Sequence, residues 1–196
     1  IAMFYSRFSK ADIRVVHAHS EPALIEMLKS GELDIVYAAH FGELFAEGLE
    51  CEFIKKRRLL LSVCSSHPAV SRASINSTEK YPKIALSEFK SDKFAISSKI
   101  LKSESNFKKI FENAGFTPQI FCDTSYLYVA NAMVAAGLCV SFSFARYIFE
   151  TQKDYITLFD VADEPLLDVS FSVVYKKPSK LAKEFIKMIK AGKSGE

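Results

Sequence analysis

The apolar residues of the first forty positions alternate between helical and extended spacing. Ile1, Phe4, Tyr5 and Phe8 recur every three to four residues, which is typical of one face of a helix. The pattern as a whole predicts a helix over residues 1–8, a strand over 13–18, a helix over 23–29 and a strand over 33–39. This order is a βαβ arrangement whose first strand we expect to be absent from the chain.

The same alternation continues to residue 189. Strands are predicted over residues 59–64, 94–97, 119–122, 138–142 and 169–175, and helices over 103–113, 125–136 and 180–189. Gly115 and Gly137 end two of these helices, as Gly31 ends an earlier one. The strand over 33–39 is apolar almost throughout, which favours a parallel sheet covered on both faces. Alternating helices and strands of this kind indicate an α/β protein.

Length and composition narrow the class of protein. The chain has 196 residues, of which 49% are hydrophobic and 25% charged, so it can bury the core of one large domain or of two small lobes. The net charge is only +3, and the longest basic run, Lys55–Arg58, is interpreted as a solvated strand entry rather than a nucleic-acid stripe. No apolar run reaches the ~20 residues of a membrane span.

The four cysteines, Cys51, Cys64, Cys122 and Cys139, contain no Cys-x-x-Cys pair, and the last three lie beside the apolar residues Val63, Phe121 and Leu138. We interpret them as small buried hydrophobes, which favours a reducing cytosol. A redox sensor at Cys64 is an alternative, but no neighbouring partner thiol is evident. His17 and His19 share one face of a predicted strand, yet no third metal ligand has suitable spacing. The sequence therefore predicts neither a metal nor a cofactor.

Four motifs occur in an order that resembles the effector-binding (substrate-binding) domain of LysR-type transcriptional regulators. The first occupies residues 28–36 and contains Gly31 and Leu33-Asp34, and the second, over 59–68, is a predicted strand followed by His67-Pro68. The third, over 114–120, begins with Ala114-Gly115-Phe116, and the fourth, over 133–140, contains Gly137. The chain departs from the family pattern at Cys139, where the family has a second glycine, and at Phe144, where it has a proline. These departures concern the shape of the pocket rather than the fold.

The resemblance implies an α/β fold of two Rossmann-like lobes with a central cleft, which is the type 2 periplasmic-binding-protein-like fold. Lobe I would comprise residues 1–63 and 166–196, without its first strand, and lobe II residues 64–165. A small anionic effector would bind in the cleft and modulate DNA binding by a helix-turn-helix domain N-terminal to this chain. The resemblance also implies a cytoplasmic homodimer or tetramer that contacts DNA only through that domain and does not contact a membrane.

Candidate site residues lie where strands end or helices begin, because ligands of open α/β sheets bind beyond the carboxyl ends of strands. The candidates for effector contact are Ser20, His40, Ser97, Ser98, Thr124 and Ser141. Ser20 and Thr124 can equally be helix caps, and His40 can be a loop residue in solvent, so both interpretations stay open. The candidates for a dimer interface, which can equally be core, are Leu24, Leu28, Phe107 and Phe111.

Two other classes of function fit the sequence less well. A solute-binding protein of a transporter would share the two-lobed fold, but it would be exported, and free cysteines argue against export. An enzyme would need a catalytic motif, and the sequence has no nucleophile elbow, P-loop, His-Glu-x-x-His or dinucleotide fingerprint. We therefore expect effector binding rather than transport or catalysis.

Overall fold

The computed structural model describes residues 1–16, 21–42, 47–72, 79–97, 106–162 and 164–191. The chain divides into two compact units. Unit 1 is Ile1–Arg57 with Val169–Glu196, and unit 2 is Arg58–Asp168. The chain leaves unit 1 at the end of β2 (Glu50–Arg58) and returns to it at the start of β9 (Asp168–Tyr175).

The predicted helices are all present in the described residues. They are α1 (Ala2–Arg7), α2 (Glu21–Ser30), α4 (Asn106–Asn113), α5 (Leu127–Ala135) and α6 (Lys180–Ala191). Gly31 follows α2 with φ of 83°, a left-handed conformation that glycine adopts without steric cost and that ends the helix as predicted. The short 3₁₀ turns are η1 (Pro68–Arg72), η2 (Leu86–Phe89), η3 (Ala145–Tyr147), η4 (Glu150–Gln152) and η5 (Pro165–Leu167).

Unit 1 is a sheet with a helix on each face. The described strands have the order β1-β9-β2, with β1 (Val36–His40) antiparallel to β9. Leu28 of α2 packs on one face, against Val36 and Val174, and Ile186 of α6 packs on the other, against Val173. The apolar character of the strand predicted over 33–39 thus reflects two covered faces, but its described neighbour is antiparallel rather than parallel.

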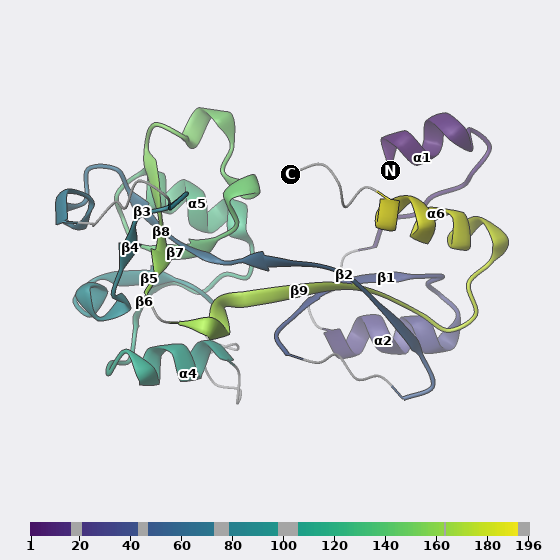
Figure 1. Ribbon diagram of the computed structural model, residues 1–196, viewed down its shortest axis with the longest axis horizontal. Helices are drawn as coiled ribbons and strands as arrows, with labels where there is room; N and C mark the ends of the chain where they lie inside the picture. The colour runs from purple at the N-terminus through teal and green to yellow at the C-terminus, as the bar shows by residue number, and fades with distance from the viewer. Residues whose placement is uncertain (17–20, 43–46, 73–78, 98–105, 163, 192–196) are drawn as a thin grey trace. The chain divides into compact units, whose positions relative to one another are not determined.

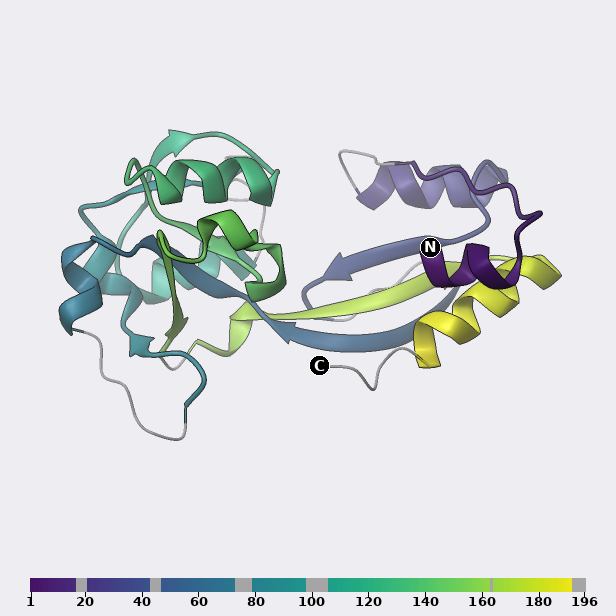
Figure 2. The ribbon, with the colours of Figure 1, turned by 90° about the horizontal axis from the view of Figure 1, so that it is seen from above.

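Helices α1 and α6 lie side by side in unit 1 in both views (Figures 1 and 2), and the ring of Phe4 packs edge-on against that of Phe185 with centroids 4.9 Å apart. The edge-to-face geometry is a favourable one for two aromatic rings. Phe4 is buried in this contact, which explains why a helix of only six residues is held in place.

Two sequence-based predictions in unit 1 are corrected. The strand expected over 13–18 is wrong for Ile13–Val16, which form no strand, while residues 17 and 18 lie outside the described part. Val15 is 71% exposed, so β-branched residues alone do not make a strand where no neighbouring strand pairs with them. Conversely, β2 was not predicted, because its mostly polar sequence lacks the alternation of a half-buried strand.

Unit 2 contains two small sheets. One has the order β4-β8-β3-β7, and its strands are β4 (Lys83–Ile84), β8 (Ile156–Val161), β3 (Leu60–Cys64) and β7 (Ser141–Ser143). The other pairs β5 (Lys93–Ala95) with β6 (Gln119–Cys122) in parallel. A bridge from Phe94 to Val140 joins the two sheets. Strands β3, β5, β6 and β7 correspond to predicted strands, whereas β4 and β8 do not.

An aromatic cluster forms much of the core of unit 2. The ring of Phe94 meets that of Phe111 edge-on at 5.1 Å, and Phe107 meets Phe142 edge-on at 5.3 Å. Phe94 is completely buried, and α4 supplies Phe107 and Phe111 from one face. This packing fixes the strands β5 and β7, whose ends carry the candidate site residues.

Candidate functional site

Three of the predicted effector contacts come together in unit 2. Ser97 follows β5 and Thr124 follows β6, and because these strands are parallel both residues lie beyond the same end of the pair. Ser141 joins them, since its hydroxyl donates a hydrogen bond of 2.7 Å to the carbonyl of Ala95 at the end of β5. We call Ser97, Thr124 and Ser141 the hydroxyl edge.

The three hydroxyls of this edge differ in what they bond. Ser141 is buried and engaged with Ala95, and Thr124 Oγ1 accepts a hydrogen bond of 3.1 Å from the backbone N–H of Tyr126, just before α5. The latter bond supports the helix-capping interpretation of Thr124. Ser97 is buried, and its hydroxyl makes no hydrogen bond to another residue of the described ranges. Ser97 is therefore the member of the edge best able to bond a ligand.

His40 lies at the end of β1 in unit 1 and uses both ring nitrogens. Nδ1 lies 2.9 Å from the carbonyl oxygen of Gly42, and Nε2 lies 2.9 Å from Oγ of Ser172 on β9. A carbonyl oxygen can only accept, so the neutral ring carries its proton on Nδ1 and Nε2 accepts from the Ser172 hydroxyl. His40 is thus a partly exposed side chain held in one orientation rather than a loop residue free in solvent.

The remaining candidates are placed as follows. Ser20 and Ser98 lie outside the described residues, as do His17 and His19. Of the four candidate interface residues, Leu24 is half-buried, whereas Leu28, Phe107 and Phe111 are buried in the core of their own unit. The dimer stays a prediction, and a second subunit on these helices would contact neighbouring exposed positions.

The cysteines do not share one environment. Cys139 is buried as predicted, and burial raises the pKa of its thiol from 9.0 to about 11. Cys51, which has glutamates on both sides, is exposed on β2. Cys64 is half-buried, with Sγ 3.2 Å from the hydroxyl oxygen of Ser66. Within the described ranges, no three His, Cys, Asp or Glu side chains are grouped as a metal site would require.

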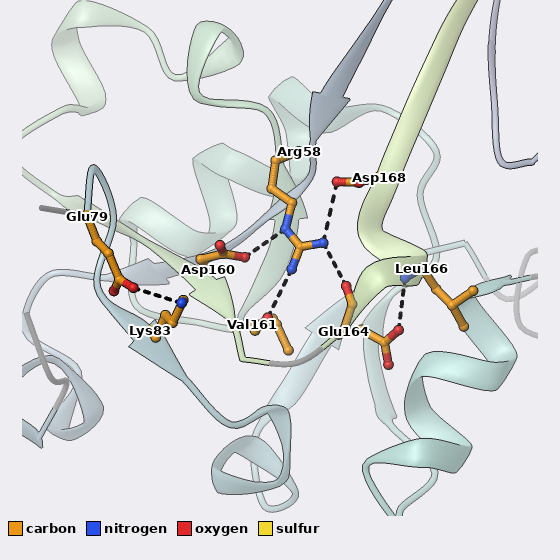
Figure 3. A network of polar contacts seen from close by, with 8 residues as sticks. All are labelled: Arg58, Glu79, Lys83, Asp160, Val161, Glu164, Leu166 and Asp168. Carbon is orange, nitrogen blue, oxygen red and sulfur yellow. Dashed lines mark hydrogen bonds and ion pairs between the residues drawn. The ribbon is translucent and has the colours of Figure 1, made fainter. Parts of the chain in front are cut away.

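The guanidinium of Arg58 lies at the point where the chain enters unit 2, and its role is not predictable from the basic run alone (Figure 3). Nε donates to Asp160 at 2.7 Å, and the other nitrogens donate to the carbonyls of Glu164 at 2.7 Å and Val161 at 3.0 Å. Asp168, the last residue of the unit, lies 3.5 Å away. Only 27% of the side chain is exposed, so Arg58 is not the solvated strand entry expected of the basic run.

A second polar network lies between α5 and the sheet of unit 2. The completely buried amide of Asn131 donates to Ser143 Oγ and to the carbonyl of Tyr147, each at 3.0 Å. The hydroxyl of Ser62 donates to the amide oxygen at 3.5 Å. These bonds tie α5 to β3 and β7, and thereby hold both segments that carry Thr124 and Ser141.

A protein-family model described as the LysR substrate binding domain matches residues 1–193, which include both units. The chain belongs to this family. The match confirms the predicted resemblance and the type 2 periplasmic-binding-protein-like fold class, and it favours a regulator's effector domain over the solute-binding protein of a transporter. A comparison with curated proteins found no match.

Solved structures of LysR-family regulators share the fold. A LysR family transcriptional regulator from Pseudomonas aeruginosa is 18% identical with a TM-score of 0.74, over 99% of this chain and 64% of that protein. The CcmR regulatory domain of Synechocystis PCC6803, in complex with 2-PG, is 12% identical with a TM-score of 0.76, and the match covers 99% of this chain and 89% of that domain. The BenM effector binding domain with its effector benzoate is 19% identical with a TM-score of 0.70, and the match covers 100% of this chain and 86% of that domain.

The chain thus spans less than two thirds of the length of the Pseudomonas regulator. Among the described residues, no helix combines the length and the apolar character needed to cross a bilayer.

Proposed function

We propose that this chain is the effector-sensing domain of a LysR-type transcription factor, and that it binds a small anionic metabolite. The observation that carries the proposal is the family match over residues 1–193, which extends through both units. In this proposal the two units are the two lobes of the domain. Effector binding changes DNA binding by a helix-turn-helix domain elsewhere in the regulator, which requires unequal affinity for two states of the protein.

The hydroxyl edge supports effector contact in unit 2. Ser97 and Thr124 lie beyond the carboxyl ends of β5 and β6, where α/β sheets bind ligands, and Ser141 at the start of β7 bonds the last residue of β5. The N-terminal N–H groups of α5 begin just after Thr124 and favour negative charge. The benzoate bound by BenM is itself a carboxylate, which agrees with an anionic class. His40 in unit 1 is a further candidate.

The proposal includes binding rather than catalysis, a homodimer or tetramer, and a cytoplasmic location. Its support is the family, whose members regulate transcription. DNA contact through a separate domain is likewise part of the proposal, and the full-length CbnR structure in complex with target DNA is the relative that motivates it.

A thermal-shift screen of the chain against carboxylates, phosphorylated metabolites and neutral analogues tests this function. A ligand that binds only the folded protein raises the melting temperature, and at 100 times its dissociation constant it adds about 2.7 kcal/mol of stability. We expect anionic compounds to give the shift. Ser97→Ala should weaken the best hit by roughly 10- to 100-fold, because a hydrogen bond to a charged group contributes about 1.5–3 kcal/mol.

Ser71→Ala is the matched control, since Ser71 is an exposed serine of the same unit whose hydroxyl bonds only the nearby carbonyl of Pro68. It should leave the shift unchanged. Neutral analogues binding as tightly as the anions would contradict the anionic class. Equal weakening by both variants would remove the hydroxyl edge from the site, and turnover of a bound ligand would contradict a purely binding role.

A further inference from the structure

Helix α6 carries a row of lysines that are not consecutive in the sequence but lie on one side of the helix. Lys180, Lys183, Lys187 and Lys190 are spaced three, four and three residues apart, so they lie along one side of the helix, and all four are exposed. Lys176 and Lys177 extend the row into the turn that precedes α6. We call these six residues the lysine row. The neighbouring face of the helix is apolar and is packed on unit 1.

The lysine row borders a groove of about 530 Å³ within unit 1, between α6 and the strands β2 and β9. Five of its lysines line the groove, against only two carboxylates, those of Glu50 and Glu52. Glu52 is already engaged, since it accepts a 2.5 Å hydrogen bond from the Tyr175 hydroxyl and pairs with Lys190. Lys187 pairs with Glu184 at 2.7 Å.

The charges therefore do not cancel along the row. Among the described residues, Lys177, Lys180 and Lys183 make no ion pair, and Lys176 bonds only the backbone carbonyl of Lys29. The one acidic residue of α6 is Glu184, which the helical spacing sets beside the row rather than within it. The row has six lysines against the carboxylates of Glu50, Glu52 and Glu184, so it keeps a net positive charge, although Lys187 and Lys190 are paired and Lys180 interacts electrostatically with Glu184.

The length of the lysine row indicates which kind of anionic partner it can bind. At 1.5 Å per residue, Lys180 and Lys190 are about 15 Å apart along the helix axis, which is longer than a small carboxylate. Duplex DNA carries a charge about every 1.7 Å of its axis, so its backbone presents several phosphates over this span. The apolar residues lining this groove, Tyr175, Pro178 and Ile186, are buried or half-buried, so the surface that a partner meets is charged rather than apolar.

We infer that the lysine row binds the phosphate backbone of duplex DNA, without reading its sequence, and so gives the regulatory domain a DNA contact of its own, in addition to the helix-turn-helix domain through which alone the resemblance led us to expect DNA contact. The inference does not depend on the effector. Phosphate contacts by lysine position a protein on DNA and make its affinity depend strongly on salt. The groove beside the row leaves room for the ammonium groups to turn toward a phosphate.

Fluorescence anisotropy with a 30-base-pair duplex of arbitrary sequence tests this, using the 196-residue chain at several salt concentrations. We expect binding at 50 mM salt, with a log–log salt slope of about −3.6 to −5.4 for four to six phosphate contacts. The double variant K180Q/K183Q should weaken binding roughly tenfold and reduce the slope by about 2. Neither residue makes an ion pair within the described ranges, and glutamine favours a helix almost as well as lysine.

The control is K90Q/K109Q, which removes the same charge from exposed positions of unit 2. It should leave the slope unchanged. No binding at 50 mM salt, or equal loss in both double variants, would overturn the inference, because the effect would then be absent or due to net charge alone. Binding of inorganic tripolyphosphate that K180Q/K183Q abolishes, with no binding of the duplex at 50 mM salt, would also overturn it, and would indicate a small-anion site. Circular dichroism checks that both variants fold.

Discussion

The two units differ in what they place inside. Seven described polar residues are buried, and six of them lie in unit 2, including Ser62, Asn131 and Ser143, while Ser172 alone belongs to unit 1. Unit 1 buries an almost purely apolar sheet between α2 and α6 and carries its charge on the surface of α6. Unit 2 buries both a network of hydrogen-bonded polar side chains and a cluster of aromatic rings.

This difference indicates how each unit is specified. Apolar packing is tolerant of shape changes, whereas a buried polar network is stable only when each donor meets an acceptor, so it selects one arrangement. The network of unit 2 connects α5, β3 and β7, from which the hydroxyl edge extends. We conclude that the polar interior of unit 2 fixes the geometry of its candidate site, whereas unit 1 uses packing as its support.

The strongest way to break this comparison is to remove the centre of the network. Asn131→Ala leaves the Tyr147 carbonyl without its donor and the Ser62 hydroxyl without its acceptor, while the Ser143 hydroxyl keeps only its bond of 3.4 Å to the carbonyl of Phe144. Because each unsatisfied buried group costs about 1–3 kcal/mol, we expect a loss of roughly 2–4 kcal/mol in the unfolding of unit 2, measured by urea denaturation.

The triple variant N131L/S62A/S143A is the control for this prediction. Replacing the three side chains by apolar groups leaves only the backbone carbonyl of Tyr147 without its partner, so it should recover part of the lost stability. A triple variant less stable than Asn131→Ala would mean that the volume of these side chains, and not their hydrogen bonds, supports the unit.

The corresponding change in unit 1 should have a smaller effect. Ser172→Ala removes the hydroxyl that donates to Nε2 of His40, but the ring is partly exposed and water can replace the donor. We expect a loss of about 1 kcal/mol, measured by the same denaturation. Ser170→Ala, on the same strand, should change the stability by less than about 0.5 kcal/mol. An effect of Ser172→Ala as large as that of Asn131→Ala would remove the contrast between the units.

The helices of this protein could be predicted from its sequence, whereas several of its strands could not. Periodicity found every described α-helix but none of the short 3₁₀ turns, because the α-helices have an apolar face and a glycine or polar boundary. It missed β2, β4 and β8 and wrongly predicted a strand at Ile13–Val16, since strand formation depends on a neighbour that local sequence does not contain.

The candidate site was predictable in its positions but not in its bonds. Ser97, Thr124 and Ser141 were found because strand ends and helix starts are readable from the chain. That Ser141 bonds Ala95 and that His40 bonds Ser172 depends on residues 46 and 132 positions away. The lysine row was overlooked for a different reason, because a search for consecutive basic residues does not detect a helical spacing of three and four.

The smallest expected effect is a difference in chemical reactivity between a cysteine of unit 1 and a cysteine of unit 2. Cys51 on β2 is exposed, whereas burial raises the pKa of Cys139 in unit 2 to about 11. Only the thiolate is alkylated, so at pH 9 we expect iodoacetamide to modify Cys51 rapidly and Cys139 only after urea unfolding, as measured by mass spectrometry of the peptides. Rapid modification of Cys139 in the folded protein would contradict a closed core in unit 2.

The raised pKa also sets the direction of a pH effect on stability. Between pH 9 and about 11 the unfolded chain loses the Cys139 proton while the folded chain retains it, so fewer protons are bound in the unfolded state and stability falls as pH rises. The contribution is complete below pH 9 and is lost as the pH passes the folded value. Cys139→Ala should remove this component of the alkaline loss, whereas Cys51→Ala should leave it unchanged. The same slope in both variants would assign the loss to other groups.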